Sequence, residues 1–176
     1  MRTRSLSKMF SILVAFCGAM AVASPAQSLT TLVNFAGPNG AEPRYGSLVL
    51  GTDGNFYGTT RDGGAHSRGT VFKMTPSGTL TTLYSFCSQS NCSDGSDPDA
   101  GLALGSDGNF YGTTTAGGAN GHGMVFKITP SGTFSVLYSF MGSDGDSPTG
   151  TLLRASDGNF YGTTQAEGAH GFGTVF

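Results

Sequence analysis

Hydrophobic residues in this chain come in short runs, separated by clusters of Gly, Asp, Asn, Pro and Ser. The first complete series of runs predicts strands at 48–50, 56–60, 70–75 and 80–86. An Asp-Gly-Asn turn joins the first two, and a Thr-Pro-Ser-Gly turn joins the last two. The sequence lacks the runs of Glu, Lys, Arg and Ala that are typical of surface helices, so the pattern predicts an all-β fold.

The stretch Asp-Gly-Asn-Phe-Tyr-Gly-Thr-Thr occurs three times, starting at Asp53, Asp107 and Asp157, with spacings of 54 and 50 residues. Four antiparallel strands in a repeat of this length are typical of a β-propeller blade. Phe56 and Tyr57 are adjacent on their strand, so they point to opposite faces and are expected to meet a neighbouring blade on each side. A β-solenoid, which has shorter coils, and a β-sandwich, which does not repeat its sequence, are the alternatives.

The predicted β-propeller-like array covers 28–176. It is divided into a fourth strand at 29–35, blades at 47–86 and 101–140, and a partial blade at 151–176.

The fourth strand at 29–35 is inferred from Leu-Thr-Thr-Leu-Val-Asn-Phe, which matches Leu-Thr-Thr-Leu-Tyr-Ser-Phe at 80–86. An N-terminal fourth strand closes the ring of many propellers by completing the last blade. The sequence holds about three blades' worth of strands, whereas propellers have four to eight blades. We therefore expect a fragment of a longer ring. The alternative is that two such chains pair to close a six-bladed ring.

Residues 1–26 have the pattern of a secretory signal peptide. Arg2, Arg4 and Lys8 precede an apolar run at 9–23, and small residues suited to cleavage follow it. The run is short for a membrane span, and an uncleaved anchor is the alternative. We predict a secreted or cell-surface protein whose mature chain does not span the membrane.

The charge balance argues against a nucleic-acid partner. The sequence has nine basic and eleven acidic residues, and the predicted signal peptide contains three of the basic ones and none of the acidic ones. The remaining formal charge is therefore −5, whereas phosphate binding requires a cationic surface. The six remaining basic residues are scattered: Arg44, Arg61, Arg68, Lys73, Lys127 and Arg154.

Two cysteines remain after the predicted cleavage, Cys87 and Cys92, and both lie in the longer of the two linkers between blades. An exported chain meets an oxidising compartment, so we predict a disulfide between them. Half of a metal site is the alternative, but it would need further soft ligands, and no other cysteine remains.

The octapeptide and the segments that follow it, Gly-Gly…Gly-Thr-Val-Phe-Lys and Thr-Pro-Ser-Gly-Thr…Leu-Tyr-Ser-Phe, resemble the Gloeo/Verruco ("GloVer") tandem repeat. The resemblance covers about 29–176. It implies an exported bacterial, repetitive, propeller-like protein, and it implies no particular activity or catalytic residue. Members of this family carry varied C-terminal surface anchors, and none is present in this sequence.

Candidate ligand-binding residues lie in the Gly-rich loops that follow each octapeptide, because these loops differ between copies while their flanks do not. His66 and His170 align with Asn120, and His122 aligns with Arg68 and Phe172. The histidines could approach one another on one face, but solvated loop side chains are the favoured interpretation, and no metal site is predicted.

Acidic residues in the linkers are weak candidates for a Ca²⁺ site, the only cofactor that the pattern suggests. They are Asp94, Asp97, Asp99, Asp144 and Asp146. No complete EF-hand pattern is present, and Asp is a common turn residue, so turns are the favoured interpretation.

Catalytic motifs such as Gly-x-Ser-x-Gly and the Walker loop are absent from the sequence. The octapeptide itself is interpreted as a structural hairpin. We therefore favour a non-catalytic, exported binding or scaffold protein whose ligand is a glycan, a surface polymer or a protein. The alternative is a propeller-type polysaccharide lyase or hydrolase whose active site lies in further blades.

Overall fold

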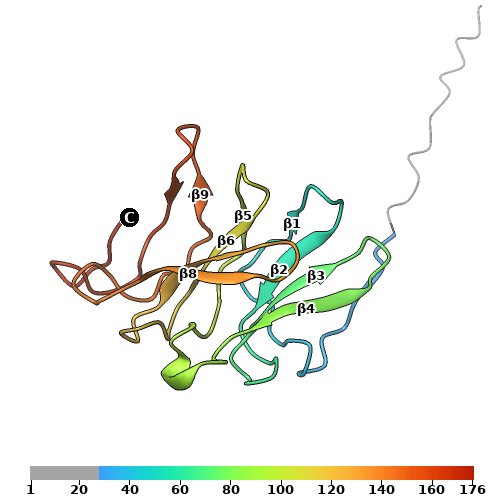
Figure 1. Ribbon diagram of the computed structural model, residues 1–176, viewed down its shortest axis with the longest axis horizontal. Helices are drawn as coiled ribbons and strands as arrows, with labels where there is room; N and C mark the ends of the chain where they lie inside the picture. Colours follow the sequence, from blue (N-terminus) through green and yellow to red (C-terminus); the bar gives the residue numbers. More distant parts are fainter. Residues whose placement is uncertain (1–27) are drawn as a thin grey trace, which may run out of the picture. The chain divides into compact units, whose positions relative to one another are not determined.

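A computed structural model describes residues 28–176, so the predicted signal peptide at 1–26 lies outside the described residues. The fold is all-β: two four-stranded antiparallel meanders are followed by a shorter third unit (Figure 1). The first blade contains β1 (Val49–Leu50), β2 (Phe56–Thr60), β3 (Thr70–Met74) and β4 (Leu80–Ser85). The second blade contains β5 (Ala103–Leu104), β6 (Phe110–Thr114), β7 (Met124–Ile128) and β8 (Phe134–Ser139).

The third unit contains β9 (Leu153–Arg154) and β10 (Phe160–Tyr161). Its third strand position is occupied by Thr174–Phe176, which exchanges backbone hydrogen bonds with Gly162 and Thr164. The only helical element among the described residues is a 3₁₀ turn, η1 (Ser90–Cys92), and none of the helices there is long and apolar enough to cross a membrane.

The innermost strands of the three units, β1, β5 and β9, lie side by side, and each sheet extends outwards from them (Figure 1). This is the arrangement of blades around a propeller axis. The paired strands of the two complete blades have matching registers: Tyr57 lies opposite Lys73 in the first blade, as Tyr111 lies opposite Lys127 in the second. The predicted β-propeller-like array of four-stranded blades is therefore confirmed.

Aromatic side chains form the contacts between blades, as the adjacent Phe and Tyr of the octapeptide predict. Tyr57 stacks on Phe110 of the second blade with ring centroids 4.0 Å apart. Tyr111 stacks on Phe160 of the third unit at 4.3 Å. Each blade therefore presents its Tyr to the following blade and its Phe to the preceding one, and the core of the molecule lies between the sheets.

The glycine that follows each Phe-Tyr pair gives room for a phenylalanine of the next strand. A Cβ atom built on Gly58 would lie 2.7 Å from the ring of Phe72, and one on Gly112 would lie 2.6 Å from the ring of Phe126. Any larger residue would displace these rings. The side chain that occupies this space belongs to β3 or β7 of the same blade.

The expected strand at 29–35 is not formed, because none of these residues pairs with another strand in the described structure. A fourth strand pairs with a third strand, and the third strands of both complete blades already pair with β4 and β8. Phe35 nevertheless packs edge-on against Phe72, with centroids 5.2 Å apart. Phe86 packs against Phe126 in the same way, at 5.3 Å.

Candidate functional site

The Gly-rich loops after β2, β6 and β10 and the linkers between blades form one continuous surface, which we call the loop face. In a four-stranded meander, the loop after the second strand and the linker after the fourth leave the sheet at the same edge. Backbone hydrogen bonds join them: Asp97 N–H donates to the Arg68 carbonyl at 3.0 Å, and Ser147 N–H donates to the His122 carbonyl at 3.2 Å. The loops are therefore held in place by the scaffold.

The octapeptide begins at the opposite edge, where its Asp-Gly-Asn turn forms a structural hairpin, and it continues along β2 towards the loop face. The Asp53 carboxylate accepts hydrogen bonds from the backbone N–H and side-chain amide of Asn55, at 3.2 and 2.7 Å, and from the hydroxyl of Tyr57 at 2.8 Å. Gly54 has a φ of 76°, which glycine adopts without strain. Asp107 and Asp157 make the same bonds in their own units.

The last two residues of the octapeptide, both threonines, link neighbouring elements. The Thr59 hydroxyl donates to the carbonyl of Ala100, in the linker before the second blade, at 2.7 Å. The Thr60 hydroxyl lies 2.8 Å from that of Thr70 on β3. In the first unit, every polar side chain of the octapeptide therefore makes a hydrogen bond within the fold.

Two of the predicted binding residues form ion pairs within the loop face. Arg68 Nη1 lies 3.7 Å from Asp97 Oδ2, and His122 Nδ1 lies 3.3 Å from Asp146 Oδ2. Both pairs join a Gly-rich loop to the linker that follows it. Asp97 and Asp146, which were weak calcium candidates, are therefore partners of basic side chains.

The other predicted binding residues differ in exposure. The Asn120 amide donates to the carbonyl of Phe140 at 3.1 Å, so it holds its loop against the end of the second blade. His66 and His170 are exposed, and Phe172 is 91% exposed. These three side chains are exposed on the loop face, as are Arg68 and Asn120.

Asp94 is fully buried and serves as an anchor for the linker that carries the disulfide. Its carboxylate accepts hydrogen bonds from the Tyr84 hydroxyl at 2.7 Å, from the Ser88 hydroxyl at 2.6 Å and from the backbone N–H groups of Ser88 and Gln89. Burial alone would raise the pKa of Asp94, but these hydrogen bonds outweigh it and lower the pKa. In the second linker, Asp144 accepts from the Tyr138 hydroxyl in the same way.

Asp99 is the remaining calcium candidate. Its Oδ1 lies 3.3 Å from Arg61 Nε, and both atoms are buried. Burial raises the pKa of Asp99, against the attraction of Arg61 and Arg44. Within 28–176, no three His, Cys, Asp or Glu side chains are grouped so that they could hold a metal ion.

Sequence reasoning did not find three of these contacts: Arg61–Asp99, Tyr84–Asp94 and Asn120–Phe140. The two residues of these contacts are 38, 10 and 20 positions apart in the sequence. Whether they come into contact depends on the path of irregular loops. One signal was available for the second of them, since a Tyr near the end of the fourth strand is followed by an Asp in both linkers.

The predicted disulfide between Cys87 and Cys92 is present, with Cα atoms 4.0 Å apart. It closes a short loop that includes η1 and lies beside the buried Asp94. A cross-link of this kind restricts the inserted part of the linker.

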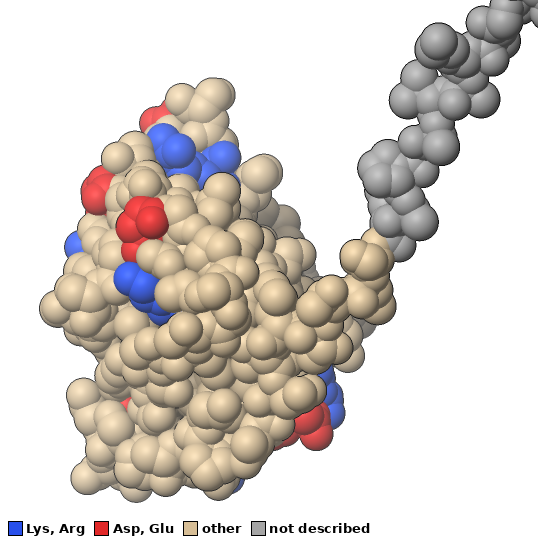
Figure 2. Space-filling model, turned by 90° about the vertical axis from the view of Figure 1, so that its right-hand side faces the viewer, with Lys and Arg blue, Asp and Glu red and all other residues tan. Residues whose placement is uncertain are grey.

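On the face drawn in Figure 2, charged side chains are sparse, and Lys and Arg lie beside Asp and Glu. Arg44 pairs with Glu42 at 2.7 Å, and Lys73 pairs with Asp53 at 3.0 Å.

Several solved structures resemble this chain, and two of them are described by their similarity. One is virginiamycin B lyase from Staphylococcus aureus, with 18% identity and a TM-score of 0.48 over 75% of this chain and 40% of that one. The other is a candidate gluconolactonase, with 16% identity and a TM-score of 0.48 over 73% of this chain and 47% of that one. This chain thus spans less than half the length of either protein. No curated protein matches the sequence.

The family comparison agrees with the repeated sequence. The Gloeobacter/Verrucomicrobia repeat model matches residues 16–176, which is nearly the whole sequence. The chain therefore belongs to the Gloeobacter/Verrucomicrobia repeat family.

Proposed function

We propose that this protein is exported and binds an uncharged or weakly charged glycan through its loop face, without catalysing a reaction. One observation carries the proposal. The residues that repeat identically are engaged in scaffold contacts, whereas exposed residues that differ between copies lie in the loops beside the linkers. Exposed loop residues that vary on a repeated scaffold are typical of a binding surface.

The chemistry of the exposed residues favours a glycan. Phe172 offers an aromatic face, and His66 and His170 offer hydrogen-bonding groups beside the glycines. Arg68 and His122 already have acidic partners, so they are poor sites for a polyanion. Hydroxyl-rich, uncharged polymers suit this combination better than nucleic acids or polyphosphates do.

Export is part of the proposal. Its support is the signal-peptide pattern at 1–26 together with the Cys87–Cys92 disulfide, which persists in oxidising compartments. Expression of the full sequence in a bacterial host, followed by mass measurement of the extracellular product, tests it. A product that still begins at Met1 would contradict cleavage.

The binding proposal is tested on an array of neutral and acidic glycans, followed by titration calorimetry with the best ligand. We expect Phe172→Ala to weaken binding by at least about 10-fold, as loss of an aromatic anchor does. Ser77→Ala, in a turn at the opposite edge, is the matched control and should bind normally. Binding that is unaffected by Phe172→Ala, His66→Ala and His170→Ala would place the ligand elsewhere and refute the loop face.

The same panel separates binding from catalysis. Incubation of the protein with each polysaccharide should leave the chain length of the polysaccharide unchanged. Shortened chains or released sugars would favour the alternative, a polysaccharide lyase or hydrolase, over the proposal made here. A protein ligand would appear as no glycan binding together with loop-dependent capture of a purified surface protein.

A further inference from the structure

A backbone carbonyl in the segment before each unit anchors the Gly-rich loop of that unit. For the second blade, this is the carbonyl of Cys92, which accepts hydrogen bonds from the N–H of Gly118 in the loop at 2.9 Å and from that of Gly95 at 2.8 Å. In the other two units a glycine takes the position of Cys92 and makes the same two bonds, at 2.9 to 3.0 Å. The anchoring glycines and their loop donors are Gly37 with Gly64 and Gly142 with Gly168.

The backbone of the anchoring residue is left-handed in all three units. The angle φ is 85° at Gly37 and 84° at Gly142, and it is 51° at Cys92. Glycine adopts such angles without strain, whereas a residue with a Cβ atom adopts them only at a cost in free energy. Cys92 is therefore held in a conformation that its own backbone disfavours.

The disulfide cancels the effect of an insertion on the path of the linker. Cys87 aligns with Met141, and Cys92 aligns with the residue that follows Met141 directly, Gly142. The disulfide brings the Cα atoms of Cys87 and Cys92 to 4.0 Å, which is close to the spacing of about 3.8 Å between consecutive residues. The extra residues, 88–91, are exposed, and they leave the path of the linker together with η1 (Figure 1).

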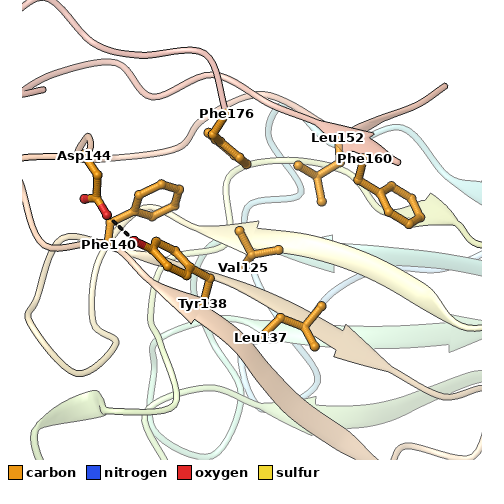
Figure 3. Close-up of a pocket in the computed structure, with 8 residues that line it drawn as sticks. All are labelled: Val125, Leu137, Tyr138, Phe140, Asp144, Leu152, Phe160 and Phe176. Carbon is orange, nitrogen blue, oxygen red and sulfur yellow. Dashed lines mark hydrogen bonds between the residues drawn. The ribbon is translucent and has the colours of Figure 1, made fainter. Parts of the chain in front are cut away.

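Beyond the insertion, the linker resumes the contacts of its uninterrupted equivalent. After the second blade, the Tyr138 hydroxyl donates a hydrogen bond to the carboxylate of Asp144, drawn as a dashed line in Figure 3. After the first blade, the Tyr84 hydroxyl donates to Asp94 at 2.7 Å. Each aspartate comes two residues after the anchoring residue. The chain has thus returned to the common path when it reaches Cys92.

We propose that the Cys87–Cys92 disulfide is a redox-dependent clamp on the Gly-rich loop of the second blade, residues 117–123. In the oxidised protein, the disulfide keeps Cys92 in place, so that its carbonyl binds Gly118. Reduction breaks the Sγ–Sγ bond, and the two sulfur atoms take up two electrons and two protons from a dithiol, which becomes a disulfide. The ends of the insertion are then free to separate, and Cys92 can leave its left-handed conformation.

Reduction should release one loop and leave the other two in place. The loops of the first and third units are anchored by glycines, which remain left-handed without a cross-link. The released loop contains Asn120 and His122, two of the predicted binding residues. The loop face therefore differs between reducing and oxidising compartments in one of its three loops. The clamp does not depend on which ligand the loop face binds.

Amide hydrogen exchange, measured by NMR with and without dithiothreitol, tests the clamp. We expect the Gly118 amide to exchange at least about 10-fold faster after reduction, because the disfavoured conformation of Cys92 and the loss of the cross-link both favour local opening. The amides of Gly64 and Gly168 should exchange at unchanged rates. Unchanged exchange at Gly118 would refute the proposal. An equal acceleration of all three amides would also refute it, because it would show a general loss of stability.

Two variants without the disulfide test the role of the left-handed conformation. Both carry Cys87→Ser, and they differ only in Cys92→Ser or Cys92→Gly. The Gly118 amide should exchange rapidly in the serine variant, as in the reduced protein. It should exchange about 5-fold more slowly in the glycine variant, which has the residue of the other two units. Equal exchange in the two variants would show that the disulfide does not act through this conformation.

A copy of the uninterrupted linker provides the control that is insensitive to reduction. Deletion of 88–91 combined with Cys87→Met and Cys92→Gly gives Phe-Met-Gly-Ser-Asp-Gly, the sequence found after the second blade. In this variant the Gly118 amide should be protected equally with and without dithiothreitol. Fast exchange at Gly118 in both conditions would mean that the two linkers do not follow a common path, and it would overturn the inference.

Discussion

The hydroxyl of Tyr57 donates a 2.8 Å hydrogen bond to the carboxylate of Asp53, and the same bond recurs in Tyr111–Asp107 and Tyr161–Asp157. The bond joins the first hairpin of each unit to the aromatic side chain that faces the next unit. An ionised Asp is the better acceptor, so protonation of the carboxylate weakens this joint.

The first prediction concerns acid stability. The side chain of Asn109, followed by the hydroxyl of Tyr111, holds the pKa of Asp107 below its usual value, and Asp53 and Asp157 are lowered by similar bonds. A lowered pKa in the folded state means that the stabilisation is present above the ordinary pKa of about 4 and is lost as the pH falls below it. Thermal melting at decreasing pH should therefore show a falling melting temperature, with a weaker pH dependence in Asp107→Asn. An identical pH dependence in that variant would contradict the assignment.

The second prediction concerns alkaline pH. Burial, assisted by the hydrogen bond to Asp94 and opposed by one from Ser88, raises the pKa of Tyr84 to about 12. A raised pKa means that the stabilisation is complete below the ordinary pKa of about 10 and is lost as the pH rises through the folded value. An ultraviolet titration of the protein minus that of Tyr84→Phe should show one phenol that ionises near pH 12. A difference curve with a midpoint near 10 would show that Tyr84 is solvated.

The third prediction compares two equivalent phenylalanines. Phe110 is fully buried and stacks on Tyr57, whereas Phe160, which stacks on Tyr111, is only partly buried. Phe110→Ala should therefore reduce the free energy of unfolding by about 3–5 kcal/mol, and Phe160→Ala should reduce it by less. Urea denaturation of both variants measures the difference. A larger loss for Phe160→Ala would mean that the two interfaces are not equivalent as described.

The fourth prediction concerns the clearance at Gly112. A Cβ atom there would lie 2.6 Å from the ring of Phe126, so Gly112→Ala should destabilise the fold by about 1–3 kcal/mol through overpacking. Gly150→Ala is the control, because its nearest neighbour would be Thr163 at an ordinary 3.5 Å. Melting temperatures should fall for the first variant and stay nearly constant for the second. An equal fall in melting temperature for both variants would show that the loss of glycine's backbone freedom, and not a clash with Phe126, causes the destabilisation.

The repeat made the scaffold predictable. The period of the octapeptide gave the blade length, and the alternation of side chains along a strand placed Phe56 and Tyr57 on opposite faces. The disulfide followed from the pairing of two remaining cysteines, and the structure contains it. These features depend on short stretches of chain, which sequence patterns describe well.

The loop contacts were less accessible. The linker acids were assigned to turns or to calcium, yet Asp94 binds Tyr84 and Asp99 lies beside Arg61. Such pairs form only after the linkers have been folded across the blade edges, and one sequence does not specify that path. The segment 29–35 pairs with no other strand of the described residues, so the local pattern predicted its sequence type without its pairing.

Tyr84 and Tyr138 each reach an aspartate in the linker that follows, although these partners are 10 and 6 residues away. The same anchoring bond therefore tolerates linkers of different length. Evolution can lengthen this loop without altering the blade contacts, and a protein engineer can do the same. The stretch between Ser88 and Ser93 lies in the longer linker, next to the Cys87–Cys92 disulfide. It is therefore a suitable site for the insertion of a new peptide.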